Sequence, residues 1–153
     1  MKHLSYLCVP VTVCLLGSSC DVVDPDGRLD ELESHREQWQ QADIQHYRMD
    51  FRASCFCALE FTELVTVEIM QDNIQSVTVV STGLPIENMS IDAWLTVTEL
   101  FAAVEQAILE DAHELQVTYD LELGYPEFVF IDREEMIIDE EMGYQVFDLE
   151  VVQ

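Results

Sequence analysis

The chain has 153 residues and a mass of 17.6 kDa, and its 31 acidic residues against 6 lysines and arginines give a formal net charge of −25. This balance excludes nucleic acid as a partner, because phosphate binding needs clustered lysine and arginine. With 49% apolar residues and only 5 glycines and 4 prolines, the composition is that of a globular domain and not of a disordered acidic tail. Composition indicates no substrate.

The first residues have the pattern of an export signal. Lys2 and His3 form a charged start, and residues 4–16 form an apolar run. These 13 residues are too few to span a bilayer, which needs roughly 20 residues of helix. The segment is therefore expected to be a targeting peptide that takes no part in the fold.

The apolar run ends in Leu15-Leu16-Gly17-Ser18-Ser19-Cys20, which resembles the lipobox of bacterial lipoproteins. The resemblance implies a signal peptide over residues 1–19 and acyl chains on Cys20, which would anchor the exported protein in the cell membrane or the outer membrane. Ordinary signal peptidase would cut the same bond, so an exported protein without lipid is the alternative. Residues 20–27 are acidic and turn-rich and predict a tether, and residues 28–153 have the length of one domain.

A helix and a strand are expected first in this domain. Leu29, Leu32 and Trp39 recur at near-helical spacing, which predicts an amphipathic helix over residues 28–42. Apolar and polar residues then alternate over residues 47–57. This alternation predicts a strand whose odd-numbered side chains face the core.

The remaining elements are a hairpin, a second helix and three more strands. Alternation over residues 65–69 and 74–80, with turn formers between them, predicts the hairpin. Thr96 and Glu99 have the spacing of a capping box, which predicts the start of the second helix. The last three strands are expected over residues 115–121, 128–131 and 144–151.

The order of these elements indicates the fold class. It runs helix, three strands, helix, three strands. Strands that are joined by short turns pair antiparallel, and each helix must bury its apolar stripe against another layer. The sequence therefore predicts an α+β domain in which two helices pack on an antiparallel sheet.

Several short motifs occur together over residues 28–151. They are Trp39, Tyr47-Arg48, Ser54-Cys55-Phe56-Cys57, residues 96–101, Tyr119-Asp120, Gly124-Tyr125-Pro126 and Ile131-Asp132. Together they resemble a bacterial family of exported proteins that is defined only as domain of unknown function 6174. The resemblance implies export and a shared fold, and it implies no activity.

Cys55 and Cys57 are the first candidates for chemistry. In an oxidising envelope, two cysteines suggest a disulfide. On a flat strand the Cβ atoms of residues i and i+2 lie roughly 6.6 Å apart, whereas a disulfide needs about 3.8 Å, so a bridge requires a bulge or turn at Phe56. The pair is either a strained bridge or two reduced core thiols, and a thiol- or metal-dependent enzyme around them is a weaker hypothesis.

A dense run of carboxylates follows the fifth strand. Asp132, Glu134, Glu135 and Asp139 are weak candidates for metal ligands, because Ca²⁺ would relieve the repulsion between them. A solvated charged loop is the favoured interpretation of such a run. Apart from this calcium hypothesis, we expect no cofactor.

A binding surface is predicted at four residues. Strand alternation points Phe56 away from the core side, where it would form a contact patch or be covered by a helix. Tyr119, Asp120 and Tyr125 flank a turn between two strands. If these three side chains are exposed they suit a binding edge, and if they are buried they only close the hairpin.

These features favour a non-catalytic envelope lipoprotein that binds an envelope protein or ligand and contacts the membrane through its lipid. The first alternative is a thiol- or metal-dependent enzyme around Cys55 and Cys57. The second is a structural domain stabilised by calcium.

Overall fold

Helices and strands follow one another in the predicted order in the computed structural model, which describes residues 27–86 and 89–152. The fold is α+β, as expected. The predicted signal peptide, Cys20 and the tether up to residue 26 lie outside the described residues. The elements are α1 (Arg28–Gln41), β1 (His46–Ser54), η1 (Leu59–Thr62), β2 (Val65–Met70), β3 (Asn73–Val79), η2 (Ile91–Ala93), α2 (Val97–Leu109), β4 (Glu114–Tyr119), β5 (Pro126–Asp132) and β6 (Met142–Val151).

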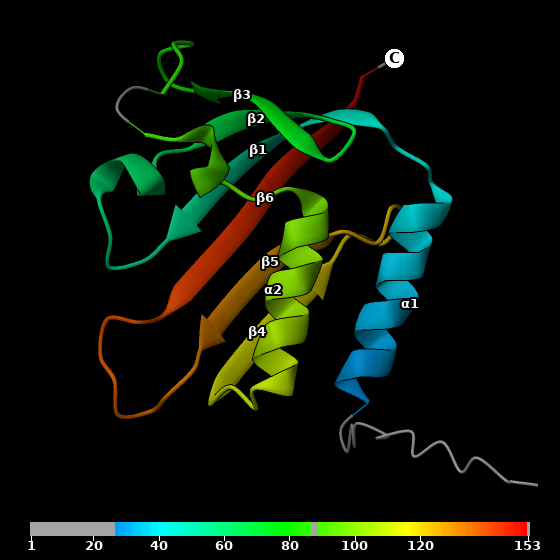
Figure 1. Cartoon of the computed structure of the whole chain (residues 1–153), viewed down its shortest axis with the longest axis vertical. Helices are drawn as coiled ribbons and strands as arrows, with labels where there is room; N and C mark the ends of the chain where they lie inside the picture. Colours follow the sequence, from blue (N-terminus) through cyan, green and yellow to red (C-terminus); the bar gives the residue numbers. More distant parts are fainter. Residues whose placement is uncertain (1–26, 87–88, 153) are drawn as a thin grey trace, which may run out of the picture.

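The six strands form one antiparallel sheet in the order β3-β2-β1-β6-β5-β4. Each half of the chain contributes three consecutive strands, and the halves meet where β1 pairs with β6 (Figure 1). This pairing runs from Tyr47 opposite Val151 to Ser54 opposite Gly143. It joins residues that are about a hundred positions apart in sequence, so both halves share one sheet.

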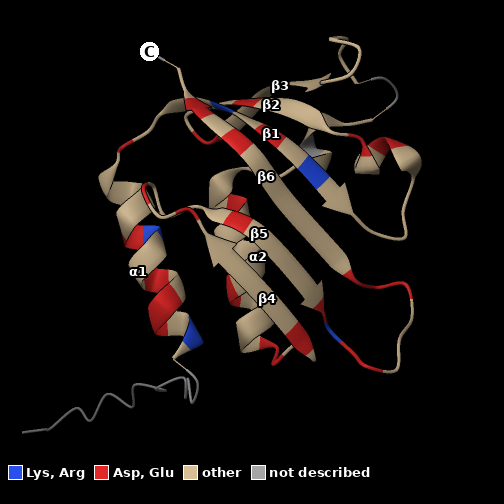
Figure 2. Ribbon diagram, turned by 180° about the vertical axis from the view of Figure 1, so that it is seen from behind, with Lys and Arg blue, Asp and Glu red and all other residues tan. Residues whose placement is uncertain are grey.

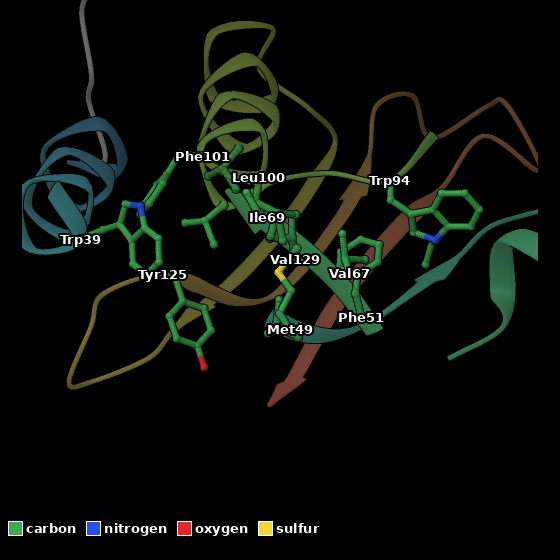
Figure 3. Packing of buried hydrophobic residues seen from close by; sticks show 14 of the residues in the cluster. Trp39, Met49, Phe51, Val67, Ile69, Trp94, Leu100, Phe101, Tyr125 and Val129 are labelled. Atoms are coloured by element: carbon green, nitrogen blue, oxygen red, sulfur yellow. The ribbon is translucent and has the colours of Figure 1, made fainter. Parts of the chain in front are cut away.

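Both helices lie on the same face of the sheet, and the view from behind shows the other face without a helix (Figures 1 and 2). The core fills the space between the helices and the sheet. Figure 3 shows sheet residues such as Met49 and Val67 on the side of the α2 residues Leu100 and Phe101. Twelve large side chains there are less than 2% exposed, and burial of such a side chain contributes about 1.5–3 kcal/mol.

The predicted inward positions of the first strand are correct as far as residue 53. Tyr47, Met49, Phe51 and Ala53 are 1–3% exposed. The strand ends at Ser54, because the chain bends at the next residues. The predicted continuation of the strand to Cys57 is therefore wrong.

The second helix begins at the predicted capping box. The Thr96 hydroxyl accepts a hydrogen bond from the Glu99 backbone N–H (3.3 Å), and the Glu99 carboxylate accepts one from the Thr96 N–H (2.8 Å). The buried Tyr47 hydroxyl accepts a third from the Val97 N–H (3.0 Å). Three of the free N–H groups that every helix start presents are thus satisfied, and the third bond ties α2 to β1.

The first helix is held against the turn between β4 and β5. The Gln38 amide donates to the carbonyl oxygens of Leu121 (3.1 Å) and Glu122 (2.9 Å). At Gly124 the helix backbone comes so close that an added Cβ would lie 2.7 Å from the His35 carbonyl oxygen. The turn therefore fixes where α1 lies.

The two 3₁₀ turns, η1 and η2, were not predicted, since each is too short to show a helical period. In the described part of the chain, no helix combines the length and the apolar character that crossing a membrane requires.

Candidate functional site

The structure joins Cys55 and Cys57 by a disulfide. Their Cα atoms are 5.3 Å apart, closer than the roughly 6.6 Å of a flat strand, because the backbone bends between them. Cys57 is exposed and Cys55 is half-buried. The alternative of two reduced core thiols is therefore wrong, and the bridge lies at the surface.

The bridge lies beside the loop between β5 and β6. Ser54, the last residue of β1, pairs with Gly143, and Ile131 near the end of β5 pairs with Met142. These pairings place the loop over residues 55–64 next to the loop over residues 133–141, at the same end of the sheet (Figure 1). Residues some eighty positions apart therefore form one end of the molecule.

Large apolar side chains are exposed on both loops. Phe56 and Leu59 on the first loop are each 80% exposed, and Met136 and Ile138 on the second are 87% and 82% exposed, with Ile137 at 47%. We call these five residues the loop surface. Phe56 was predicted from strand alternation, whereas the other four were missed. The run Met136-Ile137-Ile138 inside an acidic stretch was the signal for three of them.

Exposed apolar residues gather at this end more than elsewhere. Five large apolar side chains in the described residues are 80% or more exposed, and four of them, Phe56, Leu59, Met136 and Ile138, belong to the loop surface. The fifth is Leu121. Such clustering is typical of contact sites, whereas scattered exposed residues need no explanation.

A single glutamate organises the second loop. The Glu140 carboxylate accepts hydrogen bonds from the backbone N–H groups of Arg133 (2.7 Å) and Glu134 (2.8 Å). The bond from the Glu134 N–H is the largest of the causes that lower the pKa of Glu140. Arg133 also donates to Glu110 at 3.1 Å, which ties the loop to the end of α2. Sequence reasoning missed this role, because it treated the carboxylates only as a charged run.

The calcium candidates are not brought together. No group of three or more histidine, cysteine, aspartate or glutamate side chains in the described residues could hold a metal ion. Asp132, Glu134, Glu135 and Asp139 thus do not converge. Burial, ahead of neighbouring charges, raises the pKa of Asp132, whose Oδ1 has no hydrogen-bond partner among the described residues.

Tyr119, Asp120 and Tyr125 lie at the opposite end of the sheet and close the β4–β5 hairpin. The Asp120 carboxylate accepts hydrogen bonds from the backbone N–H groups of Glu122 and Leu123. The Tyr119 ring stacks on His35 at 4.0 Å, and Tyr125 is only 7% exposed. Burial raises the pKa of both tyrosines to about 12. These contacts favour the structural interpretation of the motif.

The face of the sheet without helices carries mixed charges (Figure 2). Asp50 lies opposite Asp148 across β1 and β6, and the Thr66 hydroxyl donates to Asp50 at 2.6 Å. The Arg52 guanidinium lies 5.3 Å from the centre of the Phe147 ring, so the aromatic ring already has a cation partner. This face is therefore a less distinct contact site than the loop surface.

A hollow of about 410 Å³ lies between the end of α1, the start of α2 and the β2–β3 turn. Its volume is within the range of ligand pockets. Its aromatic residues Trp39, Tyr47 and Phe101 are at most 8% exposed, so they offer a ligand little surface. The loop surface is the stronger candidate.

Fold and site together define an α+β domain that presents a disulfide-closed apolar loop at one end of its sheet. The chain belongs to the Family of unknown function (DUF6174), whose model matches residues 31–151. No curated protein and no solved structure matches it.

Proposed function

We propose that the protein is an exported, lipid-anchored binding module of the bacterial envelope without a catalytic role, and that its partner docks on the loop surface. The export signal and the lipobox resemblance at Cys20 support the location. The observation that carries the binding role is the exposure of Phe56, Leu59, Met136 and Ile138, each 80% or more, on two adjacent loops. Their contact with water is unfavourable, and a partner would remove it.

Both loops are held in place before any partner arrives. The bridge between Cys55 and Cys57 closes a ring around Phe56, and the Glu140 carboxylate holds the backbone N–H groups at the start of the second loop. Loops that are already ordered lose less conformational entropy on binding. The apolar side chains are therefore presented on a preorganised surface.

The charges around the loop surface indicate the chemistry of the partner. Glu134, Glu135 and Glu141 belong to the same loop, and the chain carries a formal charge of −25. A partner with an apolar centre and a basic rim is complementary to this pattern. Electrostatic steering would speed its association at low salt, and salt would weaken the effect.

The test is co-purification from the protein's own envelope. In a double variant, Phe56→Ser with Ile138→Ser, recovery of the partner is expected to fall about tenfold or more, as for the loss of interface anchors. Leu121→Ser is the matched control, because Leu121 is 91% exposed at the opposite end of the sheet. Equal recovery with the double variant and the control would refute docking at the loop surface.

The anchor is tested separately by mass spectrometry of the mature protein. Lipidation predicts a mass that includes acyl chains on Cys20, and Cys20→Ser is expected to release the protein from membranes. An unmodified mature mass would exclude the anchor and leave the binding surface to be judged by the co-purification.

One observation favours a second candidate function, which is thiol–disulfide exchange. The Cys55–Cys57 bridge is exposed at Cys57, so the thiolate of another protein could attack one sulfur and release the other as a thiolate. Serine at both positions would abolish such exchange. The proposed binding role predicts instead that the double serine variant still recovers the partner, in an amount reduced by the lost preorganisation of the loop.

A further inference from the structure

The two edges of the sheet differ. At the β3 edge the following segment folds back along the strand: the Val79 N–H donates to the Leu84 carbonyl (2.9 Å), and the Ile86 N–H donates to the Val77 carbonyl (3.1 Å). At the other edge, β4 pairs with β5 on one side. Within the described residues, its other side has no backbone hydrogen-bond partner. One edge is thus covered and the other is open.

The open edge lacks part of the usual protection against strand addition. Proteins guard exposed edges with charged side chains, prolines or bulges, or cover them with a helix or loop. Residues 115–119 of β4 read Leu-Gln-Val-Thr-Tyr and contain no charge and no proline. Pairing with β5 is regular from Glu114 to Thr118, and the register shifts only after Thr118. In a chain with 31 acidic residues, an uncharged run along an open edge favours pairing.

A groove lies beside this edge. Leu115 and Val117 point to the core side but remain partly exposed, whereas their β5 partners Ile131 and Val129 are 1% and 0% exposed. Next to them is a hollow of about 160 Å³, which is also lined by the α2 residue Ile108 and, on the side of α1, by Arg28 and Glu31. The core side is thus unfilled next to β4.

Helix α1 forms the outer wall of the groove. In both views α1 lies beyond β4, on the side away from β5 (Figures 1 and 2). Glu31 of α1 lines the same hollow as Val117, and His35 stacks on Tyr119. The helix therefore overhangs the open edge, and a further strand that paired with β4 would lie beneath the helix.

We propose that β4 accepts an extended segment of another protein as a seventh strand beneath α1. Strand addition supplies backbone hydrogen bonds, and alternate side chains supply specificity. Apolar side chains at alternate positions of the segment would enter the hollow beside Leu115 and Val117, and uncharged polar ones would lie beside Gln116 and Thr118. A second copy is a poor occupant, since pairing through its own β4 would bring its α1 over the same edge. This site goes beyond the proposed function and is separate from the loop surface.

The probe is a fluorescein-labelled peptide, Lys-Thr-Val-Thr-Val-Thr-Val-Lys, whose binding is followed by fluorescence anisotropy. The control is Lys-Thr-Val-Pro-Val-Pro-Val-Lys, which has the same charge but cannot donate two of the backbone hydrogen bonds. Each peptide carries two lysines, which an acidic protein attracts. Only the difference in affinity between the two peptides therefore reports strand addition. The alternating peptide is expected to bind about tenfold or more tightly than the control.

Two variants of the protein locate the site. Val117→Lys places a charge in the groove and is expected to weaken binding of the alternating peptide about tenfold. Thr118→Lys adds the same charge on the other face of the strand and is expected to change the affinity less than about twofold. Phe56→Ser is expected to leave it unchanged, which separates this site from the proposed function.

Amide hydrogen exchange of the unaltered protein gives a test that does not depend on any variant folding. The alternating peptide is expected to slow exchange in residues 115–119, whereas the proline peptide is not. Equal affinity of the two peptides, equal effects of the two lysine variants, or unchanged exchange in β4 would each overturn the proposal.

Discussion

Replacement of Gly124 by alanine tests whether the β4–β5 turn fixes the position of α1. Gly124 has a φ of +81°, and a Cβ there would lie 2.7 Å from the His35 carbonyl oxygen and 3.0 Å from the Gln38 Cβ. Alanine thus brings a conformational cost and a steric one. The steric cost exists only if the helix lies where the structure places it.

Gly83 separates the two costs. Its φ of +69° is also left-handed, but a Cβ there would meet nothing within 4 Å. Left-handed backbone costs alanine about 1–2 kcal/mol, and the reduced entropy of the unfolded chain offsets about 0.4–1 kcal/mol of it. Gly83→Ala is therefore expected to lower the free energy of unfolding by about 1 kcal/mol or less.

Gly124→Ala carries the same conformational cost and the clash in addition. Overpacking typically costs about 1–3 kcal/mol, so the expected loss is about 2–4 kcal/mol. Urea unfolding followed by circular dichroism measures it, because the midpoint shifts while the slope stays constant. At roughly 4 °C per kcal/mol, Tm should fall by about 10 °C. Equal losses in the two variants would refute the close contact between α1 and the turn.

Three further predictions concern the cap, the pH dependence and the disulfide. Thr96→Ala is expected to cost about 1 kcal/mol in urea unfolding, whereas Thr98→Ala, at an exposed position in the same turn, should cost less than about 0.5 kcal/mol. Hydrogen bonds from a histidine, then from an arginine, lower the pKa of Glu68, so its stabilisation is present above the ordinary pKa of 4.5 and is lost as the pH falls. Glu68→Gln should therefore make Tm fall less steeply below pH 4.5. The same fall of Tm in the variant and in the unaltered protein would contradict this. Because the Cys55–Cys57 loop is short, serine at both positions should cost less than about 2 kcal/mol, and a larger loss would show that the bridge supports the fold.

Several features of the fold could be predicted because they depend on residues close in sequence. Alternation in β1 depends on side chains two positions apart, and its inward residues up to Ala53 are those predicted. The capping box depends on Thr96 and Glu99, three positions apart. Both signals act through local backbone geometry, so the elements and the α+β class followed from them.

The candidate site was only partly predictable. Strand parity singled out Phe56, although the strand ends at Ser54 and Phe56 is exposed on the loop that follows. The position of Met136 and Ile138 beside it depends on the pairing of β1 with β6. Two other predictions were left as alternatives until burial was known. Cys57 proved exposed and bridged to Cys55, and Tyr125 proved buried.

The sequence by itself determined the acidic charge, the export pattern, the order of the α-helices and strands, and the inward face of the central strand. Each of these is a property of composition or of neighbours within a few positions. Only the tertiary structure decided which strands meet, which loops lie side by side, and which sheet edge stays open. Those outcomes depend on pairings between distant segments, whose free energy comes from the whole packed core and leaves no local pattern.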